Sequence, residues 1–467
     1  MILIDADVCA CYTEHRKAGR AESEMERSIQ NELLAWKESK RRKPLVLRGV
    51  RQCGKSWILE AFGKTFPDGC VVINFDREPE YAQFFRATKD VRRILQNLAM
   101  ASGRKITPDT LIVFDEIQAC EEALNSLKYF HEDAPEYYVA SAGSLLGLHL
   151  SGGFPVGQVD FLNMGPMTFT EFLMADGAAH YADYLASVDT LSPIPDAFFG
   201  PLTEKLKQYF VTGGMPEAVR VWAEEKDPRA VDRVLSDIIH SYESDFGKHA
   251  PTEDVPKIRY IWQSLPSQLA RENKKFLYSA VKPGARAREY ENALNWLRDA
   301  DIISKVSRIT KPGLPLSAYD DLSAFKIYAA DVGILRRLSF LPTTAFAEGN
   351  RLFTEFKGAL TENYVHQSLV RQFEAAPRYW ADAQHEVDFI IQREGDVLPV
   401  EAKAGENVTA TSIKRYLKNY DAETPFAVRL SMRNLSFDGR ILNVPLFMAD
   451  QLNRLLGSVV RPQLSEI

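Results

Sequence analysis

Cysteine is scarce in this sequence and unevenly placed. The chain has five cysteines among 467 residues, and all of them fall within its first 120 residues: Cys9, Cys11, Cys53, Cys70 and Cys120. An odd number gathered at one end does not make a disulfide framework, which excludes the class of small, disulfide-stapled secreted domains. The pattern favours a reducing cytoplasm. The Cys9-x-Cys11 pair also lacks the second pair that a zinc site would need.

Long apolar runs are absent as well. No stretch approaches the roughly 18 apolar residues that a membrane-spanning helix requires. Residues 1–17 lack a basic start followed by an apolar block and a small-residue cleavage site, so they do not predict a secretory signal. We therefore expect a cytoplasmic protein with no membrane partner, and we interpret residues 1–25 as an N-terminal extension outside the fold proper.

Positive charge is in slight deficit. The chain has 57 Lys and Arg against 63 Asp and Glu, a net charge of −6, which argues against wholesale coating of nucleic acid, although local patches can differ from the total. Its 45% apolar and 26% charged residues are ordinary for a globular protein. The length predicts about two to four domains, each large enough for its own core.

A phosphate-binding pattern follows the first predicted strand. Residues 45–56 read LVLRGVRQCGKS, an apolar run that leads into Gly49-x-x-x-x-Gly54-Lys55-Ser56. The glycines let successive N–H groups turn toward phosphate oxygens, Lys55 can reach the β- and γ-phosphates, and Ser56 can ligate Mg²⁺. The strand–loop–helix context disfavours an incidental glycine-rich turn. We expect ATP to contact Gly49, Gln52, Cys53, Gly54, Lys55, Ser56 and Trp57.

An acidic pair ends a later strand. Residues 111–114 (LIVF) are wholly apolar, as a central parallel strand requires, and Asp115-Glu116 follows them. We expect Asp115 to hold Mg²⁺ opposite Ser56, and Glu116 to polarise the attacking water as general base. A solvated acidic strand end is the alternative, but the phosphate loop upstream favours an ATPase.

Strand patterns alternate with helical patterns over the first 200 residues. We expect strands at 71–75, 111–114, 137–140 and 159–162, which predicts a doubly wound, largely parallel P-loop sheet with the two motifs on non-consecutive strands. Small polar residues follow the third of these runs. Ser144 is our candidate for placing a hydroxyl between the γ-phosphate and water, with Ser141 as second choice and a simple turn as the alternative.

The middle of the chain changes character. Residues 200–250 are helical, with a sharp turn at Gly213-Gly214-Met215-Pro216, and residues 255–345 follow a helix, turn, helix and hairpin pattern that is typical of a winged helix. Residues 257–345 hold 15 Lys and Arg against 8 Asp and Glu. With Arg286 and Arg288 at the start of a recognition helix, DNA is a candidate partner. A protein-packing winged helix is the alternative.

A second group of charged residues lies near the C-terminus. Residues 386–403 (EVDFIIQREGDVLPVEAK) predict two apolar strands joined by a tight turn. A turn at Glu394-Gly395 places Asp388 opposite Glu401, whereas a turn at Gly395-Asp396 places it opposite Lys403. Asp388 and Glu401 can chelate Mg²⁺, and Lys403, on the same face as Glu401, can orient a water or stabilise a phosphorane.

Charge in strands this apolar usually marks a site rather than exposed ion pairing, which is the alternative. The helix pattern around residues 358–365 can bring Glu362 to the same place. We therefore expect a metal-dependent site, active or vestigial, that includes Glu362, Asp388, Glu401 and Lys403.

Eight motifs in order carry a family resemblance. They are RGVRQCGKS, VFDEIQ, FPVGQVDFLNMGPMTFTEFL, YFVTGGMPEAV, FKIYAADVGIL, GALTENYV, YW…EVDFII and PVEAKAG. Over about residues 26–450 the chain resembles prokaryotic AAA-type P-loop ATPases, related to archaeal-type ATPases, that end in the domain of unknown function 4143. The resemblance implies a restriction-endonuclease-like C-terminal fold, whose motif corresponds to Glu362, Asp388, Glu401 and Lys403.

The chain departs from its relatives at one position. Many of them have Gly-Arg where this chain has Gly157-Gln158. If that arginine reaches the γ-phosphate of a neighbouring subunit in a homo-oligomer, glutamine does not replace its charge. Hydrolysis is then slow, or another arginine such as Arg220 serves.

The expected organisation has four parts. Residues 1–25 are the extension, 26–200 an AAA-type ATPase domain, 201–345 a helical and winged-helix domain, and 346–467 a nuclease-like α/β domain. The expected function is Mg²⁺-dependent ATP hydrolysis, with the nucleotide state controlling DNA binding, and DNA cleavage, by the C-terminal domain. The alternative is a non-cleaving regulatory or scaffolding switch that binds DNA or protein.

Overall fold

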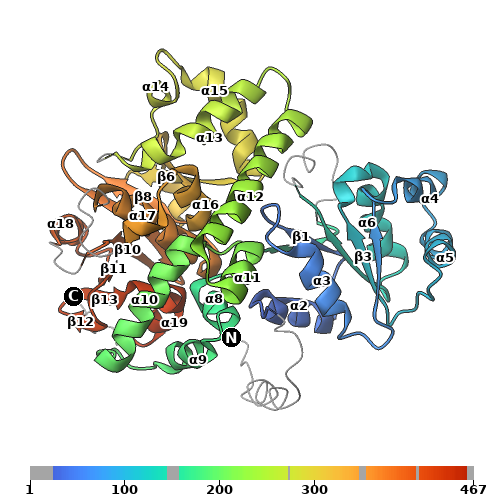
Figure 1. The fold of residues 1–467 in the computed structure, drawn as a ribbon, viewed down its shortest axis with the longest axis horizontal. Coiled ribbons are helices and arrows are strands. Elements are labelled where there is room, and N and C mark those ends of the chain that lie inside the picture. The colour runs from blue at the N-terminus through green and yellow to red at the C-terminus, as the bar shows by residue number, and fades with distance from the viewer. Residues whose placement is uncertain (1–24, 145–156, 272–273, 347–353, 406–409, 460–467) are drawn as a thin grey trace.

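The computed structural model describes residues 25–144, 157–271, 274–346, 354–405 and 410–459. They form two β-sheets and a block of helices, and Figure 1 shows the long helix α12 (Pro228–His249) running between the sheets. Within these ranges no helix is both long and apolar enough to cross a membrane. The expected N-terminal extension lies outside the described residues, apart from Met25.

The first sheet has five parallel strands in the order β2-β3-β4-β1-β5. Because β4 separates β1 from β3, the strands that lead into the phosphate loop and into Asp115 are non-consecutive, as predicted. The expected P-loop α/β fold is therefore confirmed. The strands are β1 (Leu45–Arg48), β2 (Cys70–Asn74), β3 (Leu111–Asp115), β4 (Tyr138–Ala142) and β5 (Asp160–Asn163).

Helices cover both faces of this sheet. Alternate residues of β1 point to opposite faces, so Leu45 and Leu47 enter one core while Val46 enters the other. The first core includes α2 (Ile29–Glu38) and α3 (Lys55–Gly63). The elements on the second face are η2 (Pro79–Tyr81), α4 (Ala82–Ala87), α5 (Val91–Ser102), η3 (Ile117–Ala119) and α6 (Glu121–Asp133).

The middle of the chain is helical, as predicted. Its first helix starts with a capping box, in which the Thr168 side chain and the Glu171 side chain each accept the other residue's backbone N–H. The helices are α8 (Phe169–Ala175), α9 (Ala179–Ser187), α10 (Asp196–Thr212), α11 (Pro216–Glu225), α12, α13 (Val255–Leu269), α14 (Tyr278–Val281), α15 (Ala287–Asp299) and α16 (Val332–Leu338).

The turn between α10 and α11 requires its glycines. Gly213 has φ +73°, and a Cβ there would lie 2.2 Å from Oδ1 of Asp331. A Cβ on Gly214 would lie 2.1 Å from the carbonyl oxygen of Met167. The Gly-Gly pair therefore lets α10 pack against α16 and the segment before α8 at backbone distance.

The second sheet is mixed and has eight strands in the order β12-β13-β11-β10-β9-β8-β6-β7. The strands are β6 (Ile303–Ile309), β7 (Asp320–Ala329), β8 (Arg378–Ala381), β9 (Glu386–Arg393), β10 (Asp396–Ala402), β11 (Ala427–Ser431), β12 (Ser436–Asp438) and β13 (Ile441–Pro445). The helical elements around it are η4 (Leu316–Tyr319), η5 (Thr343–Phe346), α17 (Thr354–Gln372), α18 (Thr411–Asn419), η7 (Leu446–Gln451) and α19 (Leu452–Gly457).

The hairpin expected as the wing of a winged helix belongs to this second sheet. β6 and β7 form an antiparallel hairpin, and β6 continues into the C-terminal strands by pairing with β8 at Arg308↔Tyr379 and Ile309↔Trp380. The division that we expected between residues 345 and 346 is therefore crossed by one sheet. One apolar core also extends from α2 through α10–α13 to β13.

Candidate functional site

The phosphate loop adopts the backbone that its glycines allow. Gly49 and Gly54 have φ +143° and +95°, and Gln52, although not glycine, has φ +65°. A Cβ on Gly49 would lie 1.9 Å from the carbonyl oxygen of Met164, so the loop runs against the end of β5. Gly54 is the N-cap of α3, which leaves the helix N-terminus facing the loop.

The other expected nucleotide contacts differ in exposure. Lys55 is buried, and its Nζ donates to the carbonyl oxygens of Gly49 at 2.8 Å and Val50 at 2.9 Å. Cys53 is buried and its thiol donates to Met164 O, so only its backbone faces the loop. Trp57 is 40% exposed beside Ser56 and offers an apolar surface at the site.

Two arginines brace the loop, one from outside it and one from within it, and our sequence reasoning missed both. Arg27 is buried, and its Nη1 donates to Cys53 O at 2.9 Å while its Nε contacts Glu171 Oε2 at 3.1 Å. Arg51, within the loop, donates to both oxygens of Asp245 on α12, at 2.6 and 2.8 Å. The helical block therefore holds the loop directly.

The residues expected to hold Mg²⁺ meet at the end of the sheet. Ser56 Oγ donates to Asp115 Oδ1 at 2.8 Å. Asn74, which the sequence reasoning did not select, donates from Nδ2 to Asp115 Oδ2 at 2.9 Å. Burial raises the pKa of Asp115, and the hydrogen bonds from Ser56 and Asn74 oppose that rise. A hydroxyl beside a carboxylate is a hard-oxygen donor set that fits Mg²⁺.

Glu116 lies next to the expected serine. Its φ is +48°, and its Oε2 accepts hydrogen bonds from Ser144 Oγ at 3.1 Å and from Gln118 Nε2 at 2.5 Å. Ser141, the second choice, is buried, and its hydroxyl donates to Leu45 O at 2.9 Å, which links β4 to β1 within the sheet. Gln118 was missed, although its position two residues after Glu116 was a usable signal.

The substitute arginine that we named is already engaged. Arg220 is bound by the carboxylates of Glu217 and Glu224 on its own helix α11, with its Nη2 2.6 Å from Glu217 Oε1 and its Nη1 2.8 Å from Glu224 Oε2. In this conformation it therefore reaches no phosphate. Gln158 lies just before β5, where the resemblance places an arginine.

The C-terminal hairpin has the first of the two registers we considered. Arg393 pairs with Asp396 around a turn at Glu394-Gly395, and Phe389 pairs with Val400. Extending this register by one position places Asp388 opposite Glu401, and the register that puts Asp388 opposite Lys403 is wrong. Asp388 Oδ2 accepts the backbone N–H of Ala402 at 2.8 Å.

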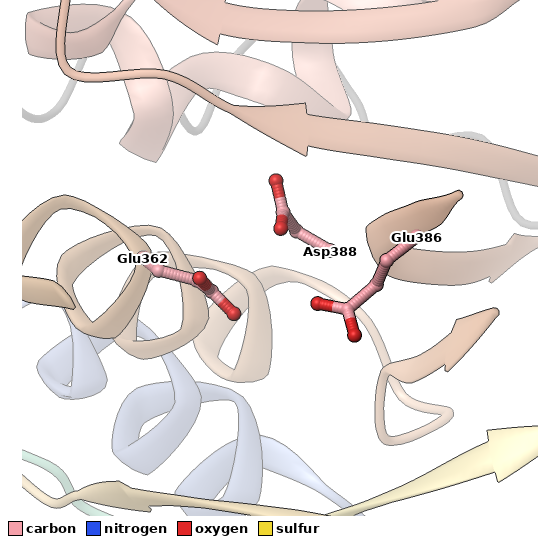
Figure 2. Close-up of side chains that lie close together, drawn as sticks. All are labelled: Glu362, Glu386 and Asp388. Carbon is pink, nitrogen blue, oxygen red and sulfur yellow. The ribbon is translucent and has the colours of Figure 1, made fainter. Parts of the chain in front are cut away.

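Three carboxylates converge on this hairpin. Oxygen atoms of Glu362, Glu386 and Asp388 lie within 4.8 Å of one another, and we call these residues the carboxylate cluster. Figure 2 shows Glu362 reaching from a helix toward Glu386, with Asp388 beside them. Glu386 was missed, although the two-residue period of a strand puts it on the same face as Asp388.

Glu401 lies beside two cations. Its carboxylate oxygens lie 3.4 Å from Lys403 Nζ and 3.6 Å from Arg429 Nε on β11. Burial raises the pKa of Glu401, whereas the carboxylates of Asp388 and then Glu401 raise the pKa of Lys403. Glu401 does not belong to the group of three close carboxylates found among the described residues, and its pairing with Asp388 on a metal stays a prediction.

The cluster contains cations from the middle of the chain. Lys326 on β7 is fully buried, with its Nζ 2.9 Å from Glu362 Oε1 and 2.5 Å from Glu386 Oε1. Lys274 pairs with Glu362 Oε2, and the Tyr328 hydroxyl donates to Glu362 Oε1. Burial alone would raise the pKa of Glu362, but the two lysines hold it far below its usual range.

The expected DNA-contacting arginines are on the surface. Arg286 is the N-cap residue of α15, Arg288 lies in its first turn, and both are exposed. Burial disfavours charge on the more interior Lys305 of β6 and lowers its pKa. Arg286 and Arg288 thus present two exposed guanidinium groups at the start of α15.

Comparisons with known families agree with the resemblance. Residues 41–173 match the AAA domain, 203–345 match the domain of unknown function DUF8612, and 357–447 match the domain of unknown function DUF4143. The chain therefore combines an AAA-type P-loop ATPase domain with a C-terminal DUF4143 domain. A search of curated proteins finds no match.

Three solved structures are similar over parts of the chain. A Walker-type ATPase of Pyrococcus abyssi is 15% identical, with a TM-score of 0.43, over 68% of this chain and 97% of that one. PCH-2 of C. elegans is 11% identical, with a TM-score of 0.27, over 46% and 69%. A DNA replication initiation factor is 14% identical, with a TM-score of 0.23, over 58% of this chain and 88% of that one.

Proposed function

We propose that this chain is a Mg²⁺-dependent ATPase whose nucleotide state controls a DNA-binding C-terminal region. The observation that supports hydrolysis best is the meeting of two pairs at one sheet edge. Ser56 donates a hydrogen bond to Asp115, and Ser144 donates one to Glu116, the next residue in the chain. The Ser56–Asp115 pair suits Mg²⁺, and the Ser144–Glu116 pair suits an attacking water.

Each of these residues has a separate role in the proposed hydrolysis. The loop N–H groups and Lys55 bind the β- and γ-phosphates, and Lys55 must first leave the carbonyl oxygens of Gly49 and Val50. Ser56 and Asp115 would hold Mg²⁺, which supplies charge neutralisation on the phosphates when bound. Glu116 accepts a proton from the attacking water, and Ser144 orients that carboxylate.

Buried hydrogen bonds support the proposed control of the C-terminal region. Asp331 is fully buried, accepts from Gly214 N, and lies 3.4 Å from Gln367 Nε2 on α17. That helix also carries Glu362 of the carboxylate cluster. On the other side, Gly214 O accepts from Met167 N, next to the segment that contacts the phosphate loop. A shift of the phosphate loop can thus be transmitted to α17 through these hydrogen-bonded residues.

We propose an ATPase domain at 26–200, a helical and winged-helix part at 201–345 and a nuclease-like part at 346–467, the last two joined by the sheet in which β6 pairs with β8. We place DNA at the exposed start of α15, which carries Arg286 and Arg288, and beside the carboxylate cluster. We place the chain in the cytoplasm, because Cys53, Cys70 and Cys120 are free thiols. The chain is proposed as a homo-oligomer, and because every copy has Gln158, a different arginine of the neighbour would have to reach the γ-phosphate.

A specific observation favours a second candidate, the non-cleaving switch. Each member of the expected nuclease motif already has a partner: Glu362 has two lysines, Asp388 has the Ala402 N–H, and Glu401 has Lys403. In that case the C-terminal domain only recognises DNA or protein when ATP is bound.

Two assays test the proposal. ATP hydrolysis with Mg²⁺ should be abolished by Lys55→Ala, and Glu116→Gln should bind ATP but turn it over at least about 100-fold more slowly. Full activity of Glu116→Gln would contradict the assignment. The second assay compares cleavage of linear, supercoiled and single-stranded DNA by the wild type and by Asp388→Ala, with and without ATP. Cleavage lost in Asp388→Ala indicates a nuclease, and ATP hydrolysis without cleavage indicates the switch.

A further inference from the structure

A lysine occupies the middle of the carboxylate cluster. Lys326 is 0% exposed, and its Nζ bridges Glu362 at 2.9 Å and Glu386 at 2.5 Å. These are two of the three residues whose oxygens lie within 4.8 Å of one another, and Figure 2 shows the space between their carboxylates. A cation therefore already sits where a divalent ion would bind.

The charges around this lysine are balanced without a metal. Glu362, Glu386 and Glu401 form ion pairs with Lys274, Lys326, Lys403 and Arg429. The fourth carboxylate, that of Asp388, raises the pKa of Lys403, so four carboxylates lie among four cations. Both oxygens of Glu362 are engaged, one by Lys326 and Tyr328, the other by Lys274. Adding a divalent ion here would bring uncompensated positive charge beside a buried ammonium. The residues as arranged do not fit Mg²⁺.

The strand that carries this lysine is held firmly in place. β7 is the edge strand of the second sheet, but the Ala329 N–H donates to Asn363 Oδ1 on α17 at 2.8 Å, and Arg378 on β8 pairs with Asp320 at 2.6 Å. Lys326 is therefore fixed beside Glu386 on β9 and Glu362 on α17.

We propose that Lys326 is the resident cation of the carboxylate cluster, and that it excludes divalent metal from these oxygens. The inference concerns the cluster alone and stands whether or not the chain hydrolyses ATP. It makes the C-terminal site self-blocking: the metal and the lysine ammonium are alternative occupants of one set of oxygens.

Calorimetric titration with Mn²⁺ alone, without nucleotide, tests the proposal. The variants are the wild type and Lys326→Met, each with and without Asp388→Asn, because binding that Asp388→Asn removes belongs to this cluster and not to the phosphate loop. Lys311→Met, at an exposed lysine of the same hairpin, is the matched control. We expect no Asp388-dependent binding in the wild type and in Lys311→Met. Lys326→Met should gain Asp388-dependent Mn²⁺ binding, at least about tenfold tighter than any such binding by the wild type or Lys311→Met.

Thermal unfolding gives a second measurement. Mn²⁺ should raise the Tm of Lys326→Met, which lacks its internal cation, and leave the wild-type Tm unchanged. Asp388-dependent Mn²⁺ binding by the wild type as tight as that of Lys326→Met would overturn the proposal, as would a folded Lys326→Met that gains no binding. If Lys326→Met does not fold, the wild type compared with Asp388→Asn decides: Asp388-dependent Mn²⁺ binding there overturns the proposal, and its absence supports it.

Discussion

Asn74 lies directly across the β2–β3 ladder from Asp115, and its side-chain amide donates to Asp115 Oδ2 at 2.9 Å. Ser56 donates to the other oxygen of the same carboxylate. The carboxylate that we assign to Mg²⁺ is therefore held from two strands and a helix. Its orientation depends on a residue outside the recognised motifs.

Asn74→Ala should weaken the use of Mg²⁺. The change leaves one oxygen of a buried carboxylate without its donor, which costs about 1–3 kcal/mol. We expect the Mg²⁺ concentration for half-maximal ATP hydrolysis to rise about tenfold. Gln96→Ala, at an exposed residue of α5, is the control and should leave it unchanged. An unaltered Mg²⁺ dependence in Asn74→Ala would show that Asp115 keeps its position unaided.

Ser144→Ala should slow the chemical step more than it weakens binding. Ser144 contacts Glu116 through both Oγ, at 3.1 Å, and backbone N, at 3.4 Å, and only the first contact is lost. We expect kcat to fall about 10- to 100-fold with little change in KM. Ser187→Ala, on the exposed side of α9, serves as control. A rise in KM at constant kcat would instead place Ser144 in nucleotide binding.

Gly213→Ala should destabilise the protein. The residue has φ +73°, and the added methyl would meet Asp331 Oδ1 at 2.2 Å. Strain and displacement of a buried carboxylate together should lower the free energy of unfolding by about 2–4 kcal/mol.

Gly247→Ala is the matched control for that change. Gly247 lies inside α12 with no atom within 4 Å of an added Cβ. There the same methyl should stabilise the protein by about 0.5–1 kcal/mol. Urea unfolding of both variants measures the contrast, and equal effects would contradict the close packing of α10 on α16.

His366 should make the protein sensitive to acid. It is buried against Tyr328, with ring centroids 4.7 Å apart, and burial lowers its pKa from 6.5 to about 3. Between these pH values the unfolded chain binds a proton that the folded chain does not, so this group makes stability rise with pH and fall as pH drops below 6.5.

His366→Phe should reduce that sensitivity, because it keeps a ring and removes the titration. Compared with the wild type, its free energy of unfolding should depend less on pH, by up to about 1.4 kcal/mol per pH unit between pH 6 and 4. Urea unfolding at several pH values measures the difference. His240→Gln, at an exposed histidine, should keep the wild-type slope. If the free energy of unfolding of His366→Phe depends on pH as steeply as that of the wild type, burial does not lower the pKa of His366.

Local patterns predicted the parts of the site that neighbouring residues determine. The hairpin was predictable from its two apolar strands and the turn between them, but two registers stayed open. The structure has the turn at Glu394-Gly395, where Glu394 adopts the φ of +53° that such a turn needs. The phosphate loop was predictable because its strand, glycines and helix are consecutive in sequence. Asp115 was predictable because an apolar strand ends there.

The missing parts depend on distant pairing. Asn74 gains its role from the β2–β3 register, and Lys326 from the way one hairpin packs beside another. A basic residue in a strand of alternating character gives no sign of which carboxylate it will meet. The expected metal pair was incomplete for the same reason, since Glu362 and Glu386 come together through packing of α17 on the sheet.

The single sheet shared by β6–β7 and β8–β13 has a consequence for how this region can be separated or inherited. A fragment that begins at residue 346 would leave β8 with an open edge and would strip Glu362 of Lys326 and Tyr328. Such a fragment should aggregate rather than fold. Recombination between relatives would likewise have to exchange residues from about Ile303 onward as one block, so the matched limits at 345 and 357 divide a unit that natural selection must keep whole.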